Sequence, residues 1–137
     1  MLELLIVMFV MVLLMSLIVG VGKLIHEKAA RQQTLSTIEI CRNAYDAINE
    51  RYKNDGLTMP PPTPGLKELI TDTTYGAVGK DRLSGLPTEA YDSNHNIVDA
   101  YGYPLKFSTG GLGGQPVIYS IGPDGQDGTT DDIRPDR

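Results

Sequence analysis

The chain begins with a continuous apolar stretch and then changes to a pattern in which only one face of a helix is apolar. Between Glu3 and Lys23 lie 19 residues without a charge, LLIVMFVMVLLMSLIVGVG. A helix of this length rises about 28 Å, which matches a hydrocarbon core of about 30 Å. A cleaved signal peptide is the alternative, but it would have a basic start and an apolar stretch of only about 7 to 15 residues. The pattern favours a retained membrane span.

After the apolar stretch, apolar side chains recur at three- and four-residue intervals. They are Leu35, Ile38, Cys41, Tyr45, Ile48 and Tyr52, and most charged residues fall elsewhere on the circumference. No proline interrupts residues 1–53, so one continuous helix of about 50 residues is predicted. Residues 1–22 would be a transmembrane helix, and residues 23–53 the amphipathic helix half of a soluble domain over 23–137. Cys41 and Tyr45 are interpreted as packing residues.

Proline and glycine end the predicted helix. The segment 54–65, NDGLTMPPPTPG, places Gly56 where a helix C-terminus is expected, followed by four prolines. A short helix is expected over 66–71 and an irregular loop over 72–96, within a loop region assigned to 54–95. Strands are expected over 96–100, 104–108 and 116–121, and the last two flank the glycine-rich connection STGGLGGQ. The fold class predicted is α+β, with the long helix packed on a small antiparallel β-sheet in 96–137.

Charge is distributed unevenly along the chain, whose formal net charge is -5. Residues 54–137 contain six basic and twelve acidic residues, a balance of -6, and ten of the acids are aspartates. Nucleic acid is therefore excluded as a partner, because phosphate binding needs a basic surface. The single cysteine does not identify a redox compartment. His26 and His95 have no partner at the spacing of a nucleophile or metal site, so no enzyme is predicted.

The C-terminal segment YSIGPDGQDGTTDDIRPDR places several carboxylates among glycines. Asp124, Asp127, Asp131 and Asp132 fall within nine residues. Calcium binds about six to eight oxygen ligands, and glycines let a chain turn tightly enough to offer backbone carbonyls together with Asp side chains. The alternative is a flexible acidic tail with ordinary Asp-Gly turns. A helix-loop-helix calcium motif does not fit, because no Glu closes the loop.

Several segments resemble the type IV pilin superfamily. MLELLIVMFVMVLLMSLIVGVG is similar to the start of mature pilins and pseudopilins, where Phe-Thr-Leu-Leu-Glu opens a long hydrophobic helix, and Glu3 falls on that glutamate. PPPTPGLKEL, DAYGYPLKF and YSIGPDGQDGTTDDI then occur in the same order as in the major (G-type) pseudopilin of type II secretion. The resemblance covers nearly the whole chain and implies a pilin-like fold with a C-terminal calcium loop.

The resemblance also implies a function, partners and a location. The chain would be a structural subunit that polymerises through its hydrophobic helix into a pseudopilus and drives protein export across the outer membrane. Its partners would be copies of itself, other pseudopilins, an inner-membrane assembly platform and, for the precursor, the prepilin peptidase. It would cross the bacterial inner membrane once, with its soluble domain in the periplasm. The alternatives are a type IV pilin or minor pseudopilin, or a monomeric membrane-tethered calcium-binding module.

Site residues are carried over by the same resemblance. The calcium ligands would be the side chains of Asp124, Asp131 and Asp132 and backbone carbonyls that include that of Ile121, with Asp127 as an outer candidate. Glu3 would neutralise the N-terminal amine of a neighbouring subunit in the filament.

The sequence departs from the family in two places. The family's basic leader, cleavage glycine and first two mature residues do not precede Met1. We expect a misplaced start codon, and the alternative is a divergent, unprocessed copy. Ala100 and Tyr101 replace Pro-Trp in the family signature Asp-Pro-Trp-Gly-Asn-Pro.

The charges beside the span bear on its orientation in the membrane. Lys23 and Lys28 follow the span, and the positive-inside rule alone would place the domain in the cytoplasm. The family orientation is opposite, and a basic leader would supply the cytoplasmic charge.

Overall fold

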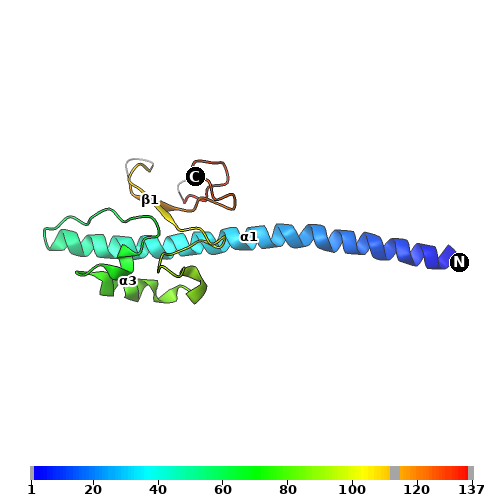
Figure 1. The fold of residues 1–137 in the computed structure, drawn as a ribbon, viewed down its shortest axis with the longest axis horizontal. Helices are drawn as coiled ribbons and strands as arrows, with labels where there is room; N and C mark the ends of the chain where they lie inside the picture. Colours follow the sequence, from blue (N-terminus) through cyan, green and yellow to red (C-terminus); the bar gives the residue numbers. More distant parts are fainter. Residues whose placement is uncertain (1, 112–114, 136–137) are drawn as a thin grey trace.

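A single long helix, α1, runs the length of the molecule (Figure 1). The computed structural model describes residues 2–111 and 115–135, without the side chains of residues 2, 18–21, 23 and 24. Helix α1 spans Leu2–Asn54, which confirms the predicted continuous helix. The turn that follows the helix contains Gly56, whose positive φ of 70° lets the chain reverse. The N–H of Leu57 donates to the Tyr52 carbonyl at 2.8 Å and that of Gly56 to Lys53 at 3.0 Å, the pair of bonds that closes a Schellman motif.

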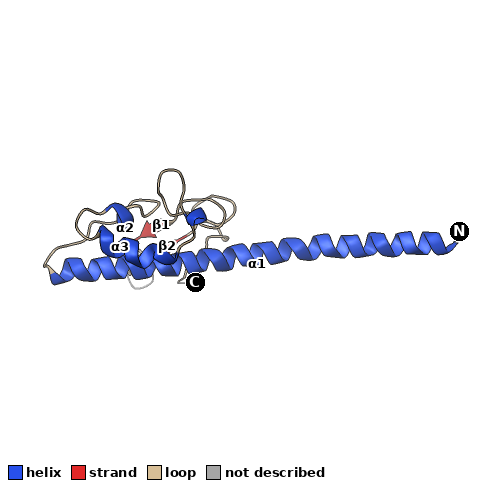
Figure 2. Cartoon of the chain, turned by 90° about the horizontal axis from the view of Figure 1, so that it is seen from below, coloured by secondary structure: helices blue, strands red, loops and turns tan. Residues whose placement is uncertain are grey.

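The other elements pack against the C-terminal half of α1, where the predicted apolar stripe lies (Figures 1 and 2). Ile38, Cys41 and Ile48 are almost completely buried, and Leu35 and Tyr45 are half-buried against the same core. Facing them are Leu66, Leu69, Leu83, Ile97, Leu105, Ile118 and Ile133. Each buried side chain of this size contributes about 1.5–3 kcal/mol. The stripe therefore forms one wall of the core of a single folded domain.

The sheet is small and antiparallel. Strand β1, Lys106–Ser108, pairs with β2, Val117–Tyr119, so that Phe107 lies opposite Ile118. Two of the predicted strands are thus confirmed, although both are shorter than expected. The third, over 96–100, makes only isolated bridges from Ile97 and Val98. Pairing stops there because Asp99 begins a tight turn, in which its Oδ1 accepts the N–H groups of Tyr101 and Tyr103 at 2.9 Å each.

The segment predicted as an irregular loop over 72–96 contains a helix, which is a correction. Helix α2 spans Glu68–Thr71 inside the expected short helix. It is followed by α3, Gly76–Arg82, and by 3-10 turns η1, Leu83–Gly85, and η2, Thr88–Ala90. Gly76 and Gly79 of α3 allow close packing against α2. A Cβ at Gly79 would lie 1.7 Å from the Leu69 carbonyl oxygen and 2.9 Å from Ile48 Cδ1.

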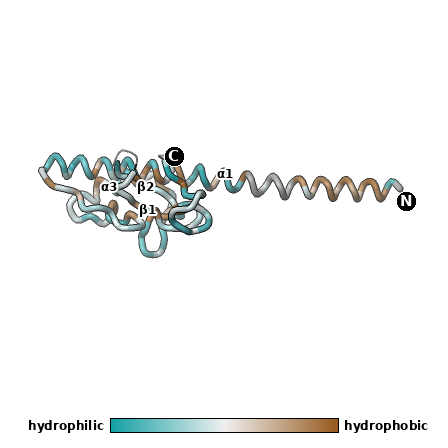
Figure 3. Tube along the Cα trace, turned by 90° about the horizontal axis from the view of Figure 1, so that it is seen from above, coloured by the Kyte–Doolittle hydropathy of each residue, from teal (hydrophilic) through white to brown (hydrophobic). Residues whose placement is uncertain are grey.

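The N-terminal half of α1 extends beyond the folded domain and is apolar (Figure 3). Every large apolar side chain from Leu4 to Leu17 is between 47% and 72% exposed. A contiguous apolar surface of this kind marks a contact with lipid or with another protein. Within the part of the chain that the structure describes, no helix is both long and apolar enough to be assigned as a membrane span. The span predicted over 1–22 includes Met1 and the side chains of residues 18–21, which lie outside the described set.

Removing residues 1–22 is expected to leave a folded monomer. The described side chains over 3–17 are exposed, whereas the buried positions of α1 begin at Thr34. The core should therefore survive the deletion, while the apolar surface that promotes association is lost. Size-exclusion chromatography and thermal unfolding followed by the near-ultraviolet circular dichroism of the tyrosines would check this. Aggregates without a cooperative transition would contradict it.

Candidate functional site

The acidic loop, residues 121–132, is held closed at its two ends. Ser120 follows β2 directly and forms an antiparallel bridge with Ile133, with N–H to O distances of 3.1 and 3.0 Å. Ile121 and Ile133 are both buried, at 7% and 2% exposure. Because both ends are fixed to the core, the carboxylates between them are confined to a small volume. A flexible acidic tail would not be anchored to the core at both ends in this way.

Glycine permits the tight path at the start of the loop. Gly122 has a positive φ of 70°, and a Cβ there would lie 2.5 Å from the Asp131 carbonyl oxygen and 2.7 Å from Asp131 Oδ2. Any other residue would be strained by its backbone conformation and would also collide with that carboxylate. Gly122 therefore brings the beginning and the end of the acidic loop into contact.

Asp124 and Asp131 form one half of the loop. The N–H of Asp124 donates to Asp131 Oδ2 at 3.2 Å, and the Thr129 hydroxyl donates to Asp131 Oδ1. The Thr129 hydrogen bond lowers the pKa of Asp131 the most, and the Asp124 N–H lowers it further. The Asp131 carboxylate therefore stays ionised at neutral pH. Asp124 Oδ1 accepts the N–H of Gln126 at 2.8 Å, which orients that carboxylate as well.

Asp127 and Asp132 form the other half, around Arg134. Arg134 Nη2 lies 3.4 Å from Asp132 Oδ2 and 4.0 Å from Asp127 Oδ1. Its guanidinium lies over the ring of Tyr119, 4.1 Å from the centroid, and the Tyr119 hydroxyl donates to both oxygens of Asp127 at 3.1 and 3.2 Å. Burial, and then the bond to Asp127, raises the pKa of Tyr119. The tyrosine thus remains a neutral hydrogen-bond donor.

Asp132 is the most deeply buried carboxylate of the loop. Its side chain is 1% exposed, and its Oδ2 accepts the N–H of Gly128 at 3.2 Å in addition to the Arg134 contact. Its Oδ1 is buried without a hydrogen-bond partner in the described part of the chain. A buried carboxylate oxygen without a partner destabilises the fold, because it has lost its hydration and gained no hydrogen bond. Ionised groups in a protein interior are normally paired or bound to metal.

These observations fit a hard cation such as calcium. The donor set is oxygen, the glycine backbone turns tightly, and Asp132 Oδ1 lacks a partner. The structure brings the predicted residues together in two pairs, Asp124 with Asp131 and Asp127 with Asp132, while Ile121 lies at the buried start of the loop. Over residues 2–111 and 115–135, no three acidic, histidine or cysteine side chains converge on one point. The calcium ligand set stays a prediction.

The sequence reasoning missed the residues that connect the loop to the core. The Ser120 hydroxyl donates to Asp99 Oδ2 at 2.5 Å, and the Gly122 N–H donates to Ser120 Oγ at 3.0 Å. Asp99 and Ser120 are both buried. The signal was the string DAYGY, because an Asp followed three residues later by Gly is typical of a β-turn. The roles of Arg134 and Tyr119 had no local signal, since the bridge between Ser120 and Ile133 brings these two residues together.

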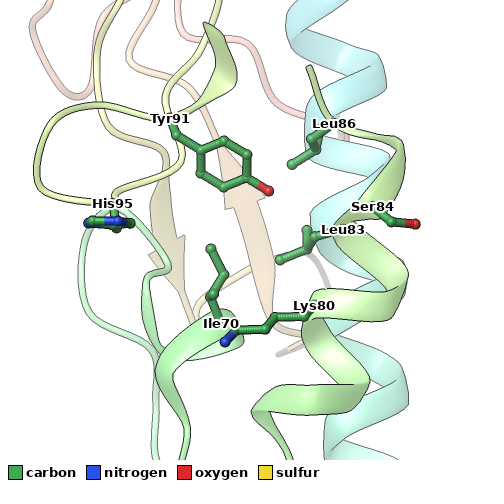
Figure 4. A pocket seen from close by; sticks show the side chains of 7 residues that line it. All are labelled: Ile70, Lys80, Leu83, Ser84, Leu86, Tyr91 and His95. Atoms are coloured by element: carbon green, nitrogen blue, oxygen red, sulfur yellow. The ribbon is translucent and has the colours of Figure 1, made fainter. Parts of the chain in front are cut away.

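A second feature is an apolar cavity of about 340 Å³ next to α2, α3 and η1 (Figure 4). It is lined by Ile70, Lys80, Leu83, Ser84, Leu86, Tyr91 and His95. His95 is exposed and has a positive φ of 62°, in a turn where its N–H donates to the Asp92 carbonyl at 3.1 Å. His95 is therefore a surface residue beside the cavity. His26 is likewise exposed, on α1.

Comparisons with known proteins agree on one family. The family model for type II secretion system protein G matches residues 24–135. The chain is 33% identical over 132 residues to type II secretion system core protein G of Pectobacterium carotovorum subsp. carotovorum, covering 96% of this chain and 79% of that protein. The corresponding protein of Aeromonas hydrophila is 30% identical over 132 residues, with 96% and 86% covered. That of Klebsiella michiganensis is 32% identical over 137 residues, with 96% and 87% covered. No solved structure matches the chain significantly.

Proposed function

The chain belongs to the type II secretion system protein G family, and we propose that it polymerises through the apolar half of α1 and binds calcium in its acidic loop. It is a structural subunit of the type II secretion pseudopilus. Family membership carries this conclusion, since the match extends over the folded domain and through the acidic loop to residue 135. A cell-envelope location follows from the same membership.

The exposed apolar half of α1 supports polymerisation. Its side chains from Leu4 to Leu17 contact nothing in the folded domain that would cover them. Removing one such side chain from water contributes about 1.5–3 kcal/mol, so the segment is stable only in lipid or against other apolar helices. Before assembly it crosses the inner membrane once, with the folded domain in the periplasm. In the pseudopilus it packs against the same segment of neighbouring subunits.

The proposed partners are those that the resemblance to pseudopilins implies. Copies of the chain and other pseudopilins cover the apolar helix in the filament. An inner-membrane assembly platform adds the subunits, and the prepilin peptidase processes the precursor. The acidic domain, which is predicted not to bind nucleic acid, would face the aqueous compartment. The folded domain lies beside only the C-terminal half of α1 (Figure 2). Neighbouring subunits could therefore reach the N-terminal half of the helix without displacing the domain.

The acidic loop is the proposed calcium site. The side chains of Asp124, Asp131 and Asp132 and the backbone carbonyl of Ile121 would hold the ion, and Asp127 would contribute from the outside. Bound calcium would supply the positive charge that keeps these carboxylates together. The closed loop ends, the Gly122 contact and the unpaired Asp132 Oδ1 support this assignment. Because Ser120 links the loop to Asp99, a rigid loop would also stiffen the turn at 99–103.

Replacing Glu3 with alanine is expected to impair filament assembly without preventing membrane insertion. Glu3 lies in the first turn of α1 and is exposed, so it contributes nothing to the core of the domain. Its proposed role is an intersubunit charge pair with the N-terminal amine of a neighbour. The chain would be expressed behind a leader that the prepilin peptidase cleaves. Membrane fractionation then measures insertion, and crosslinking with electron microscopy of sheared filaments measures assembly.

Glu50→Ala is the matched control, since Glu50 is also an exposed glutamate on α1 but lies beside the folded domain. It should assemble normally. A normal filament yield from Glu3→Ala would contradict the proposed role of Glu3. If the unmutated processed chain inserts but crosslinks only as a monomer, the subunit function itself fails and a membrane-tethered calcium-binding module takes its place.

A further inference from the structure

Arg134 is the basic residue that the structure places in the half of the acidic loop formed by Asp127 and Asp132. Its side chain is only 22% exposed, and it reaches Asp132 at 3.4 Å and Asp127 at 4.0 Å. The guanidinium is oriented by two different contacts, the Asp132 carboxylate and the face of Tyr119 at 4.1 Å. A planar cation held in this way is fixed in position, unlike a long side chain moving freely in solvent.

The burial of Asp132 makes this cation necessary. A carboxylate with 1% of its side chain exposed loses most of its hydration, and without a nearby positive charge it would destabilise the fold. Arg134 supplies that charge through Asp132 Oδ2, while Oδ1 of the same carboxylate has no partner among the described residues. One carboxylate therefore has one oxygen facing an internal cation and one buried oxygen without a partner among the described residues, which a bound cation would satisfy.

We propose that Arg134 is an internal counter-cation of the acidic loop, which shares Asp132 with the calcium ion and lowers the affinity of the loop for it. The inference rests on the calcium site proposed above. A positive charge beside a shared carboxylate repels a divalent cation that binds the same group. The same charge stabilises the Asp127 and Asp132 half of the loop when calcium is scarce. Arg134 is thus a positioning residue that weakens calcium binding and keeps this half of the loop ordered when calcium is absent.

The two effects of Arg134 have opposite signs, which gives the test. The full chain is purified in detergent micelles and compared with Arg134→Gln, which keeps hydrogen-bonding capacity but removes the charge. In chelator, Arg134→Gln should melt about 5 °C lower, because Asp132 loses its counter-charge. In titration calorimetry with calcium chloride, it should bind calcium about tenfold more tightly, equal to about 1.4 kcal/mol. A residue that merely supports the loop would lower both stability and affinity.

Two variants serve as controls. Arg134→Lys keeps the charge and should bind calcium with nearly the affinity of the unmutated chain. Arg42→Gln removes an arginine from a surface pair with Asp46, in which both side chains are about 60% exposed, and should change neither measurement.

The other possible outcomes contradict either the counter-cation inference alone or the calcium site together with it. Calcium affinity that is unchanged or weaker in Arg134→Gln overturns the counter-cation inference and leaves the calcium site in place. Equal affinity changes in Arg134→Gln and Arg134→Lys also overturn it, because charge is then not the cause. If neither the unmutated chain nor Arg134→Gln binds calcium, the calcium site fails and the inference fails with it.

Discussion

Gly79→Ala is expected to lower the free energy of unfolding by about 3 kcal/mol or more, enough to unfold much of the domain at physiological temperature. Gly79 lies in α3 where this helix crosses α2 and α1. An added Cβ would lie 1.7 Å from the backbone oxygen of Leu69 and 2.9 Å from Ile48 Cδ1. The oxygen belongs to the backbone of α2 and cannot rotate away, so α3 would have to move away from α2, and its contact with Ile48 of α1 would also be disturbed. Separation would expose the core around Leu69 and Ile48, which are both buried.

The measurement is a thermal melt of the full chain in detergent micelles, followed by near-ultraviolet circular dichroism. The far-ultraviolet signal is less informative, because α1 contributes most of the helix and its N-terminal half is independent of the domain. Gly85→Ala is the matched control, since nothing lies within 4 Å of a Cβ at Gly85 and its φ is not in the left-handed region. It should leave stability unchanged or raise it by up to about 1 kcal/mol. A melting temperature for Gly79→Ala equal to that of the control would show that α3 does not pack as described.

Saturating calcium is expected to stabilise the domain by about 2.7 kcal/mol at 100 times Kd, because at the proposed site the ion would bind the folded loop and not the unfolded chain. For a domain of this size that corresponds to a rise in melting temperature of about 10–20 °C. Chelator should reverse the rise. Magnesium should substitute poorly, since it requires a tighter octahedral shell and releases its waters reluctantly. Calorimetry at millimolar calcium, together with melts in calcium and in chelator, measures both effects.

Variants of the carboxylates separate calcium binding from folding. Asp124→Ala and Asp132→Ala should abolish the calcium response, and Asp127→Ala should weaken it less, because Asp127 is half-exposed and engaged by Tyr119. Asp132→Asn is the sharper variant, since it keeps an oxygen for the Gly128 N–H and removes only the charge. A melting temperature indifferent to chelator would reduce the loop to an acidic tail closed by its own hydrogen bonds.

The position of the functional segments could be predicted from sequence because their signals are local. The apolar stripe of α1 follows from side-chain spacing, and the end of the helix just before Gly56 follows from the conformational freedom of glycine. The confinement of the acidic loop could not be predicted, since it depends on the bridge between Ser120 and Ile133, thirteen residues apart. The interruption of the expected strand 96–100 depends on Asp99, which forms a turn rather than continuing a ladder.

By itself the sequence determined the long helix, its apolar and one-sided halves, the sheet-forming segments and the concentration of carboxylates near the C-terminus. These features depend on periodicity, propensity and composition, and all three are set by residues that lie close together in the sequence. Only the tertiary structure decided that Gly79 is a packing position in a helix and that Arg134 lies between Tyr119, Asp127 and Asp132. The physical reason is that both depend on which surfaces meet across the core, and that choice minimises the free energy of the whole domain rather than of any local segment.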